Sequence, residues 1–319
     1  MLSDVEGQVE AVRILRRVVD GHLRDPLLLV GEEGVGRRFS TVQAIKEIYC
    51  QGERQSTCGC CDCTQINQGF HPDLTIIETA EDKPIKVDTI RETIQLAWKR
   101  PTTAPKRFIL LDGADRMTSE AANAFLKTLE EPPPTTRFIL LTESYQRVIP
   151  TIRSRCGKVS YRPLPDSFVL SVLQRFEPDH VKASIYARMG EGSVGRSVSY
   201  WGAGQLALRD RVFALLQQAL AGDLPGLFSA VDAIGANLPL ALRFVEQLLH
   251  DLLMVSTAPD RLINLDLQEE AQRVRNGAPL LVWTRLGQGA REIREKYRWT
   301  RINLAFHVKA LFAEVFFAS

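Results

Sequence analysis

Residues 108–113 read FILLDG, an apolar stretch that ends in an aspartate and a glycine. Upstream, residues 31–38 read GEEGVGRR and follow a second short apolar stretch at 27–30. A glycine-rich loop after one strand, followed later by a strand that ends in aspartate, is typical of the phosphate-handling motifs of P-loop ATPases. The two stretches therefore predict a P-loop fold. For the glycine loop taken alone, an ordinary strand-to-helix turn is the alternative.

The glycine loop lacks the side chains that hydrolysis requires. A working loop carries lysine and then serine or threonine, where this chain has Arg37 and Arg38. Gly31, Gly34 and Gly36 keep the backbone shape, so a nest of amides could still hold a phosphate. A guanidinium about 4 Å from a dication would be repelled by roughly 8 kcal/mol at an effective dielectric of about 20, and it cannot ligate the metal.

The second motif is incomplete in the same sense. Asp112 stands where a Walker B aspartate would hold magnesium through water. The next residue is Gly113, where an active enzyme of this type has a glutamate that orients the attacking water. Asp115 is too far along the chain to replace that glutamate directly. We therefore expect nucleotide to be absent or not hydrolysed, so that the chain is no enzyme by itself.

The composition excludes several classes of protein. Apolar residues make up 45% and charged residues 24% of 319 residues, which is ordinary for a globular chain of two or three domains. Apolar runs such as the one at residues 26–30 are far too short to span a bilayer, and no secretory leader is evident. We therefore expect a cytoplasmic protein without a membrane partner. The net charge of +2 gives no general field for nucleic acid, so any DNA contact should be local or shared among subunits.

Strands and helices alternate in the first half of the chain. Strands are predicted at 27–30, 73–77, 107–111, 138–141 and 159–161, and helices at 9–19, 39–48, 90–98 and 119–129. We expect Asp88 to cap the third helix and Thr118 or Ser119 to cap the fourth. This alternation predicts βαβ units and a parallel sheet covered on both faces.

Beyond a proline-containing linker near residue 163, no strand pattern is evident. Helices are predicted at 168–176, 181–189, 194–201, 206–220, 238–255, 280–297 and 302–317. We therefore expect an α/β domain over 1–163, with a cysteine-rich insert at 50–71, then a small helical domain over 164–204 and a larger helical domain over 205–319.

The cysteines are concentrated in one segment. They are Cys50, Cys58, Cys60, Cys61, Cys63 and Cys156. The first five exceed the four thiols that tetrahedral zinc needs, and two pairs among them have the spacing that lets one turn supply two ligands. A site made only of cysteines leaves no open position for catalysis, so we predict structural zinc. Free or redox-active thiols are the alternative.

Two further segments place arginines where a phosphate could be reached. Residues 150–156 read PTIRSRC, and an exposed arginine there could reach a phosphate bound by a neighbouring subunit. An arginine supplied in this way raises the rate of phosphoryl transfer by about 10³- to 10⁵-fold. A surface salt bridge is the alternative for Arg153 or Arg155. Residues 192–196 read GSVGR and place Arg196 at a helix start, where it could face the phosphate loop. A solvated arginine is the alternative there.

Together these motifs resemble the bacterial clamp-loader subunits of DNA polymerase III, most closely those of the delta-prime type. The most specific stretch is AANAFLKTLEEPP at 121–133. The other matching stretches are VEGQ at 5–8, the loop at 34–38, the insert that leads to HPD at 71–73, SRC at 154–156 and GSVGR at 192–196. The resemblance covers residues 5 to about 200, and the last third matches only in being helical.

The resemblance implies an AAA+ fold with a helical lid domain over 164–204 and a helical collar domain over 205–319, through which five subunits form a ring. It implies that Arg155 is a finger that points into an ATP site of an adjacent gamma- or tau-type subunit. It also implies that Thr142 lies at the sensor-1 position and Arg196 at the sensor-2 position.

The resemblance further implies a zinc module. Its first-choice ligands are Cys50, Cys58, Cys61 and Cys63. The family separates its last two cysteines by two residues, whereas one residue separates Cys61 from Cys63. Cys60 is therefore the alternative to Cys61.

A function and partners are implied as well. A non-hydrolysing subunit of this type supports a hetero-pentamer of gamma- or tau-type ATPase subunits and a delta subunit. That assembly loads the sliding clamp onto primer–template DNA during replication.

Two alternatives remain open. One is an active gamma- or tau-type ATPase, which Arg38, Gly113 and the absence of a tau tail oppose. The other is a zinc-bearing nucleic-acid-binding module on an AAA+ scaffold, which the modest net charge and the few aromatic residues near the cysteines oppose.

Overall fold

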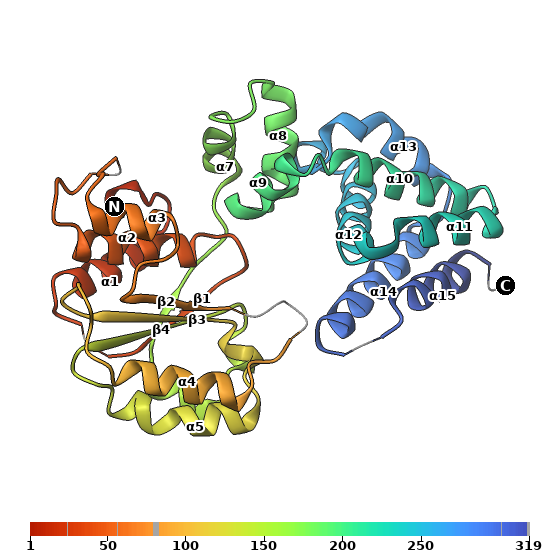
Figure 1. Ribbon diagram of the computed structural model, residues 1–319. Helices are drawn as coiled ribbons and strands as arrows, with labels where there is room; N and C mark the ends of the chain where they lie inside the picture. The colour runs from red at the N-terminus through yellow and green to blue at the C-terminus, as the bar shows by residue number, and fades with distance from the viewer. Residues whose placement is uncertain (24, 56, 79–82, 301, 318–319) are drawn as a thin grey trace. The chain divides into compact units, whose positions relative to one another are not determined.

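The computed structural model describes residues 1–317 except 24, 56, 79–82 and 301. This chain forms two compact units (Figure 1). The sheet unit contains Met1–Phe168 and Gly192–Arg196, and the helical unit contains Val169–Glu191 and the chain from Ser197 onward. The compact units divide the segment 164–204 between them, and the scheme of three domains remains a prediction.

A five-stranded parallel sheet lies at the centre of the sheet unit, in the order β2-β3-β4-β1-β5. The strands are β1 Leu27–Val30, β2 Leu74–Ile77, β3 Arg107–Asp112, β4 Thr136–Thr142 and β5 Gly157–Ser160. Because all strands run the same way, the sheet has one amino edge, where they begin, and one carboxyl edge, where they end. The predicted α/β fold with a parallel sheet is confirmed.

Helices cover both faces of this sheet, as Figure 1 shows. They are α1 Val9–Val19, α2 Arg37–Tyr49, α3 Cys61–Asn67, α4 Val87–Ala97, α5 Ser119–Glu130 and α6 Pro150–Arg153, with short 3-10 turns η1 Leu2–Asp4, η2 Ala114–Arg116 and η3 Tyr145–Arg147. Leu29 packs with α1 and α2 on one face, and Leu28 packs with α4 and α5 on the other. Alternate side chains of β1 thus enter two different cores, as expected for a buried parallel strand.

The helical unit contains all of its predicted helices and two more, α11 and α13. Its helices are α7 Asp166–Leu173, α8 His180–Met189, α9 Val194–Gly202, α10 Leu206–Leu220, α11 Leu224–Ile234, α12 Leu238–Met254, α13 Gln268–Asn276, α14 Leu280–Trp299 and α15 Leu304–Phe317, with 3-10 turns η4 Gly235–Asn237, η5 Pro259–Arg261 and η6 Leu265–Leu267. The first residues of α7 and α9 belong to the sheet unit. Trp283, Phe244 and Phe312 are its largest buried side chains.

The stretch Leu224–Met254 is long and apolar enough to cross a membrane by length and composition alone. It is divided into α11 and α12 at Gly235, whose φ of 56° and ψ of −124° interrupt the helical backbone. Leu227 and Val231 of α11 and Leu252 of α12 are fully buried within the helical unit. Core packing therefore accounts for the apolar character of this stretch.

The structure corrects the prediction for the start of α4. Lys86 is the N-cap residue, and Asp88 lies in the first turn, where its charge favours the helix dipole without capping it. Thr118 caps α5 as expected, because its hydroxyl oxygen accepts a hydrogen bond from the amide of Ala121. Four described helices were not predicted, namely α3, α6, α11 and α13.

Candidate functional site

The glycine loop lies at the carboxyl edge of the sheet, between β1 and α2. Gly34 and Gly36 have φ values of 75° and 99°, in the left-handed region that favours glycine. Gly36 is also the N-cap residue of α2. A Cβ on Gly31 would lie 2.7 Å from the Cβ of Tyr161, so this glycine permits the close approach of the chain that leaves β5. The loop therefore keeps the backbone shape of a phosphate cradle.

Arg37 occupies the lysine position as a buried cation. Its side chain is only 7% exposed, and among the described residues its Nη1 has no hydrogen-bond partner. Burial lowers the pKa of this guanidinium, while the nearby carboxylates of Asp112 and Asp115 act in the opposite direction. An arginine remains charged in proteins. The carboxylates of Asp112 and Asp115 therefore lie near enough to Arg37 to favour its charged form.

Arg38 is paired with a carboxylate near the end of β2. Its Nη1 forms an ion pair with Glu78, just beyond the end of β2, and both side chains are about half exposed. This pairing gives the guanidinium of Arg38 a carboxylate partner outside the glycine loop. It supplies no oxygen that could hold the metal in place of the missing hydroxyl.

The backbone conformation of residue 113 favours glycine. Its φ of 89° and ψ of 46° are left-handed, and it is the N-cap residue of the turn η2. Its amide donates to the carbonyl of Leu141 over 3.0 Å, which ties the turn to β4. A Cβ there would lie 2.3 Å from Nε of Arg116. A glutamate at this position would have a strained backbone, because residues other than glycine rarely adopt this conformation.

Thr142 ends β4 beside the start of the glycine loop. Its Oγ1 lies 2.7 Å from Oδ1 of Asp115, and its carbonyl accepts a hydrogen bond from the amide of Gly31. From the sequence, Asp115 is expected to lie too far along the chain to replace the missing glutamate, because it follows Asp112 by three positions. The 3-10 turn η2 places Asp115 at the carboxyl edge of the sheet beside Thr142. A second acidic residue three positions after Asp112 was the feature of the sequence that could have indicated this.

The segment 192–196 packs directly against the glycine loop. The hydroxyl of Ser193 donates to the carbonyl of Glu33 over 2.8 Å, and the amide of Gly195 donates to the carbonyl of Gly34 over 3.0 Å. Nη2 of Arg196 lies 3.2 Å from a carboxylate oxygen of Glu32, and the arginine side chain is only 8% exposed. Arg196 is therefore a buried, paired side chain at the phosphate loop and differs from the solvated arginine of the alternative.

Arg155 lies at the opposite edge of the sheet. It precedes β5, whose first residue pairs with Leu27 at the start of β1. Its Nε donates to a carboxylate oxygen of Glu130 over 2.7 Å, and its side chain is 29% exposed. The length of β1, about 10 Å, separates Arg155 from the glycine loop. Arg155 therefore lies away from the glycine loop of its own chain.

Four cysteines form a cluster in the sheet unit. The Sγ atoms of Cys50, Cys58, Cys60 and Cys63 all lie within 4.8 Å of one another. A tetrahedron of thiolates around zinc has an edge of about 3.8 Å, so the cluster is close to metal-binding geometry. Backbone donation from Cys63 lowers the pKa of the Cys60 thiol to about 6, whereas burial raises the pKa of the Cys50 and Cys63 thiols.

The cluster corrects the first-choice ligand set, because it contains Cys60 in place of Cys61. Cys61 is the first residue of α3 and is exposed, whereas Cys63 is fully buried. Helical residues two positions apart point about 200° apart, so Cys61 and Cys63 diverge. Cys60 precedes Cys63 by three positions and shares its side of the helix.

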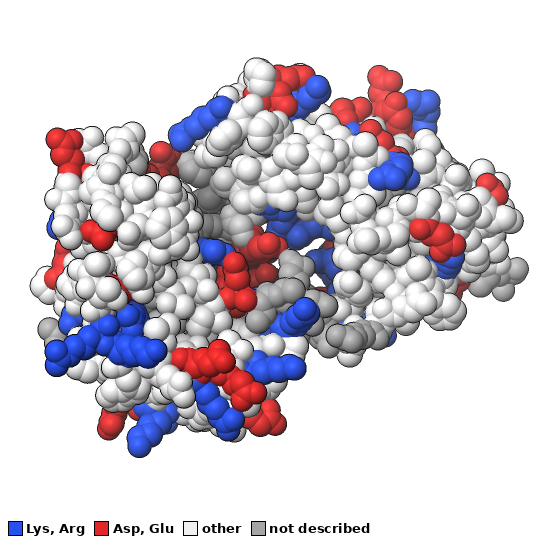
Figure 2. All heavy atoms as spheres, in the orientation of Figure 1, with Lys and Arg blue, Asp and Glu red and all other residues white. Residues whose placement is uncertain are grey.

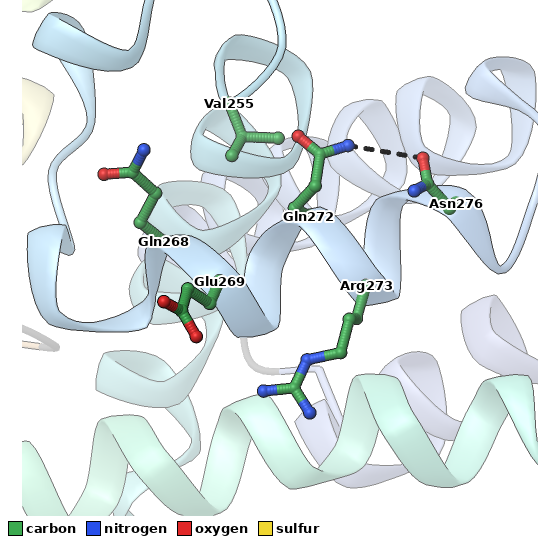
Figure 3. Close-up of a pocket in the computed structure, with 6 residues that line it drawn as sticks. All are labelled: Val255, Gln268, Glu269, Gln272, Arg273 and Asn276. Atoms are coloured by element: carbon green, nitrogen blue, oxygen red, sulfur yellow. Dashed lines mark hydrogen bonds between the residues drawn. The ribbon is translucent and has the colours of Figure 1, made fainter.

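A shallow pocket of about 430 Å³ lies on the helical unit beside α13 (Figure 3). Its lining residues are Val255, Gln268, Glu269, Gln272, Arg273 and Asn276. Within this pocket, Nε2 of Gln272 donates to Oδ1 of Asn276 over 3.3 Å. The lining holds no thiol, hydroxyl or imidazole, so we assign no chemistry to it.

Charges on the sheet unit are distributed in small groups. Figure 2 shows basic and acidic side chains next to each other on the visible face, with some basic side chains gathered at the left margin. This pattern agrees with the small net charge of +2.

Residues 7–165 match the family model described as DNA polymerase III, delta subunit. DNA polymerase III subunit delta' of Pseudomonas aeruginosa is 35% identical over 156 residues, which are 48% of this chain and 47% of that protein. Subunit delta' of Escherichia coli is 28% identical over 248 residues, 76% of this chain and 73% of that protein. Subunit gamma/tau of Mycobacterium tuberculosis is 27% identical over 292 residues, 81% of this chain and 50% of that protein. The match thus spans about half the length of the Pseudomonas relative.

Proposed function

The chain belongs to the DNA polymerase III delta-subunit family, and from this premise we propose that it is a delta-prime-type clamp-loader subunit that does not hydrolyse ATP. The observation that carries the proposal is the state of its own phosphate site. Arg37 is a buried cation, Arg38 is paired with Glu78, and Gly113 stands where the water-orienting residue belongs. The site keeps the frame of a P-loop without the groups that hold magnesium and water.

The same subunit serves a neighbouring active site through Arg155. This side chain lies at the amino edge, away from the glycine loop of its own chain. In the isolated chain it is paired with Glu130, which holds it at the surface until a phosphate of higher charge competes for it. Thr142 and Arg196 are the sensor-position residues, and both contact the loop or its turn.

The partners that we propose follow from this role. They are gamma- or tau-type ATPase subunits and a delta subunit in a hetero-pentamer, the sliding clamp, and primer–template DNA reached through the assembly. The site of action is the replication fork in the cytoplasm.

The isolated chain is expected to show no ATP turnover above background in an ATPase assay. Gly113→Glu should not restore turnover, and it should lower the free energy of unfolding by about 1–2 kcal/mol because residue 113 is left-handed. Gly113→Ala is the matched control, since it carries the backbone cost without the carboxylate. Turnover by the wild-type chain at the rate of a normal clamp-loader motor would refute the proposal.

An active ATPase of the gamma/tau type is the second candidate function, and the similarity to a mycobacterial gamma/tau subunit favours it. Arg38 and Gly113 oppose it for the reasons given above. The same ATPase assay on the purified chain separates the two candidates.

We further propose that the cysteine cluster holds structural zinc through Cys50, Cys58, Cys60 and Cys63. The donor set fits, because four thiolates complete a tetrahedral shell and leave no open position for catalysis. The dication would keep all four sulfurs deprotonated despite the burial of Cys63.

Zinc titration should show one bound ion per chain. Cys63→Ser should weaken binding by more than about a hundredfold, since a lost ligand should cost more than a lost outer-shell partner. Cys61→Ser should leave the affinity unchanged, because this exposed thiol lies outside the cluster. Loss of zinc in the Cys61 variant alone would contradict the assignment.

A further inference from the structure

A buried chain of polar contacts begins beside the cysteine cluster. The amide of Asp73 donates to Nδ1 of His71 over 3.1 Å, so the ring proton lies on Nε2. Nε2 in turn lies 3.1 Å from Oδ1 of Asp62 and donates to it. Asp62 is the neighbour of the cluster residue Cys63 on α3, and His71 is 3% exposed. Both ring nitrogens of His71 are thus engaged, and it connects α3 to the entry of β2.

A second contact runs parallel to the first. Tyr49 directly precedes the cluster residue Cys50, and its ring lies 4.7 Å from the ring of His71. Its hydroxyl oxygen lies 2.8 Å from the carbonyl oxygen of Asp73 and 2.6 Å from that of Lys106. Tyr49 beside Cys50 and Asp62 beside Cys63 therefore both contact the segment 71–73.

Asp73 also contacts the segment 96–107, which we call the α4–β3 corner. Its carboxylate is fully buried and accepts hydrogen bonds from the amides of Thr102, Thr103 and Ala104 at 2.8–3.0 Å. It also pairs with Nη2 of Arg107 at 3.0 Å.

Arg107 completes the corner by holding the end of α4. Nη1 of Arg107 donates to the carbonyls of Leu96 and Lys99, and Nη2 donates to that of Arg100. These carbonyls lie at and just beyond the helix end, where helix carbonyls lack partners within the helix and need other donors. Arg107 thus contacts both the corner and the carboxylate of Asp73. The backbone of Asp73 in turn contacts His71 and Tyr49 beside the cluster.

The cluster lies between α2 and α3, where this chain of contacts begins. Cys50 is the C-cap residue of α2, Cys60 is the N-cap residue of α3, and Cys63 lies within α3. The seven residues of α3 are too few for a helix that is stable by itself. A shared ion would fix α3 against α2, and with it the position of Asp62 relative to His71.

We propose that metal occupancy of the cysteine cluster sets the order of the α4–β3 corner, with Asp62, His71 and Asp73 as the positioning residues that couple them. This inference rests on the proposed zinc site. Zinc binding and backbone order are measured separately, so a failure of the site can be distinguished from a failure of the coupling.

The test is amide hydrogen exchange of the full chain, metal-free and with saturating zinc. Zinc should slow exchange of the amides of Thr102, Thr103 and Ala104 by about tenfold, the effect of securing one buried hydrogen bond. Exchange in β4 should not change. In Asp62→Ala, zinc should still bind while most of the protection at 102–104 is lost.

Cys61→Ala is the matched control, because it alters the adjacent residue of α3 outside both the cluster and the contact chain. It should reproduce the wild-type response. Zinc binding without a change at 102–104 would overturn the coupling alone, and so would an equal change in β4, which reports general stabilisation. Absence of zinc binding would overturn the metal site together with the coupling.

Discussion

Replacing Arg155 with alanine is expected to slow ATP hydrolysis at the adjacent site of an assembled clamp loader by about 10³- to 10⁵-fold. The guanidinium would stabilise charge that develops on the transferring phosphate, and no other group of the subunit is proposed for that task. The observable is the DNA-stimulated ATPase rate of a complex reconstituted with gamma- or tau-type and delta subunits. This total rate should fall by the share that the adjacent site contributes to it.

The fold should tolerate this substitution. The ion pair between Arg155 and Glu130 has exposures of 29% and 47%, and a pair so open to solvent contributes about 0–1 kcal/mol. The melting temperature of the subunit and its assembly into the complex should therefore be those of the wild type. An effect on the ATPase rate can then be assigned to the active site.

Arg153→Ala is the matched control, because Arg153 lies two residues away and its guanidinium lies 4.9 Å from the ring centre of Tyr145. That variant should keep the wild-type rate. If Arg155→Ala leaves the DNA-stimulated rate unchanged, the finger role is wrong and the side chain makes only local contacts, with Glu130 and with Thr151.

The second large effect is expected for Asp73→Ala, which should lower the free energy of unfolding by about 3–5 kcal/mol. The substitution leaves the guanidinium of Arg107 buried at 4% exposure without its carboxylate, and it removes the acceptor of three amides. Urea unfolding measures the change. Asp88→Ala is the control, since its carboxylate is 80% exposed and should contribute less than about 1 kcal/mol.

The pH dependence of unfolding checks the same interaction. Burial by itself would raise the pKa of Asp73, but the amides of Thr102, Thr103 and Ala104 and the guanidinium of Arg107 hold it below its ordinary value of 3.8. Because the folded-state pKa is the lower one, the stabilisation is present above about pH 4 and is lost as the pH falls through the folded-state value. The difference between wild type and Asp73→Asn should therefore shrink in acid. A difference that stays constant down to pH 2 would contradict this account.

Regular elements were the part of the fold that could be predicted. The bounds of α1, β1 and α10 agree with the sequence pattern, because each has a continuous apolar run or a clear helical face. The helices α11 and α13 were missed for different reasons. Pro225 and Gly226 obscured the start of α11, although Asp223 caps it, and α13 is mostly polar, so that periodicity says little about it.

The positions of the candidate residues in the fold could be predicted, whereas their side-chain partners could not. Arg37, Asp112 and Thr142 lie at strand and loop ends, and the strands of a parallel sheet bring such ends to one edge. The partners of Arg38 and Arg155 could not be predicted, because Glu78 and Glu130 are 40 and 25 positions away in the chain. Only folding brings these carboxylates within reach.

The sequence by itself determined the class of protein, since a glycine loop with Arg37 and Arg38, a strand that ends in Asp112 and Gly113, and a cysteine-rich insert are local patterns whose chemistry depends on residue type. The tertiary structure decided that Cys60 joins the cluster in place of Cys61, and that His71 and Asp73 connect that cluster to the end of α4. The reason is directional. Which way a side chain points, and which distant carbonyl or carboxylate it meets, depends on helix phase and on strand order, and neither is present in the spacing of residues along the chain.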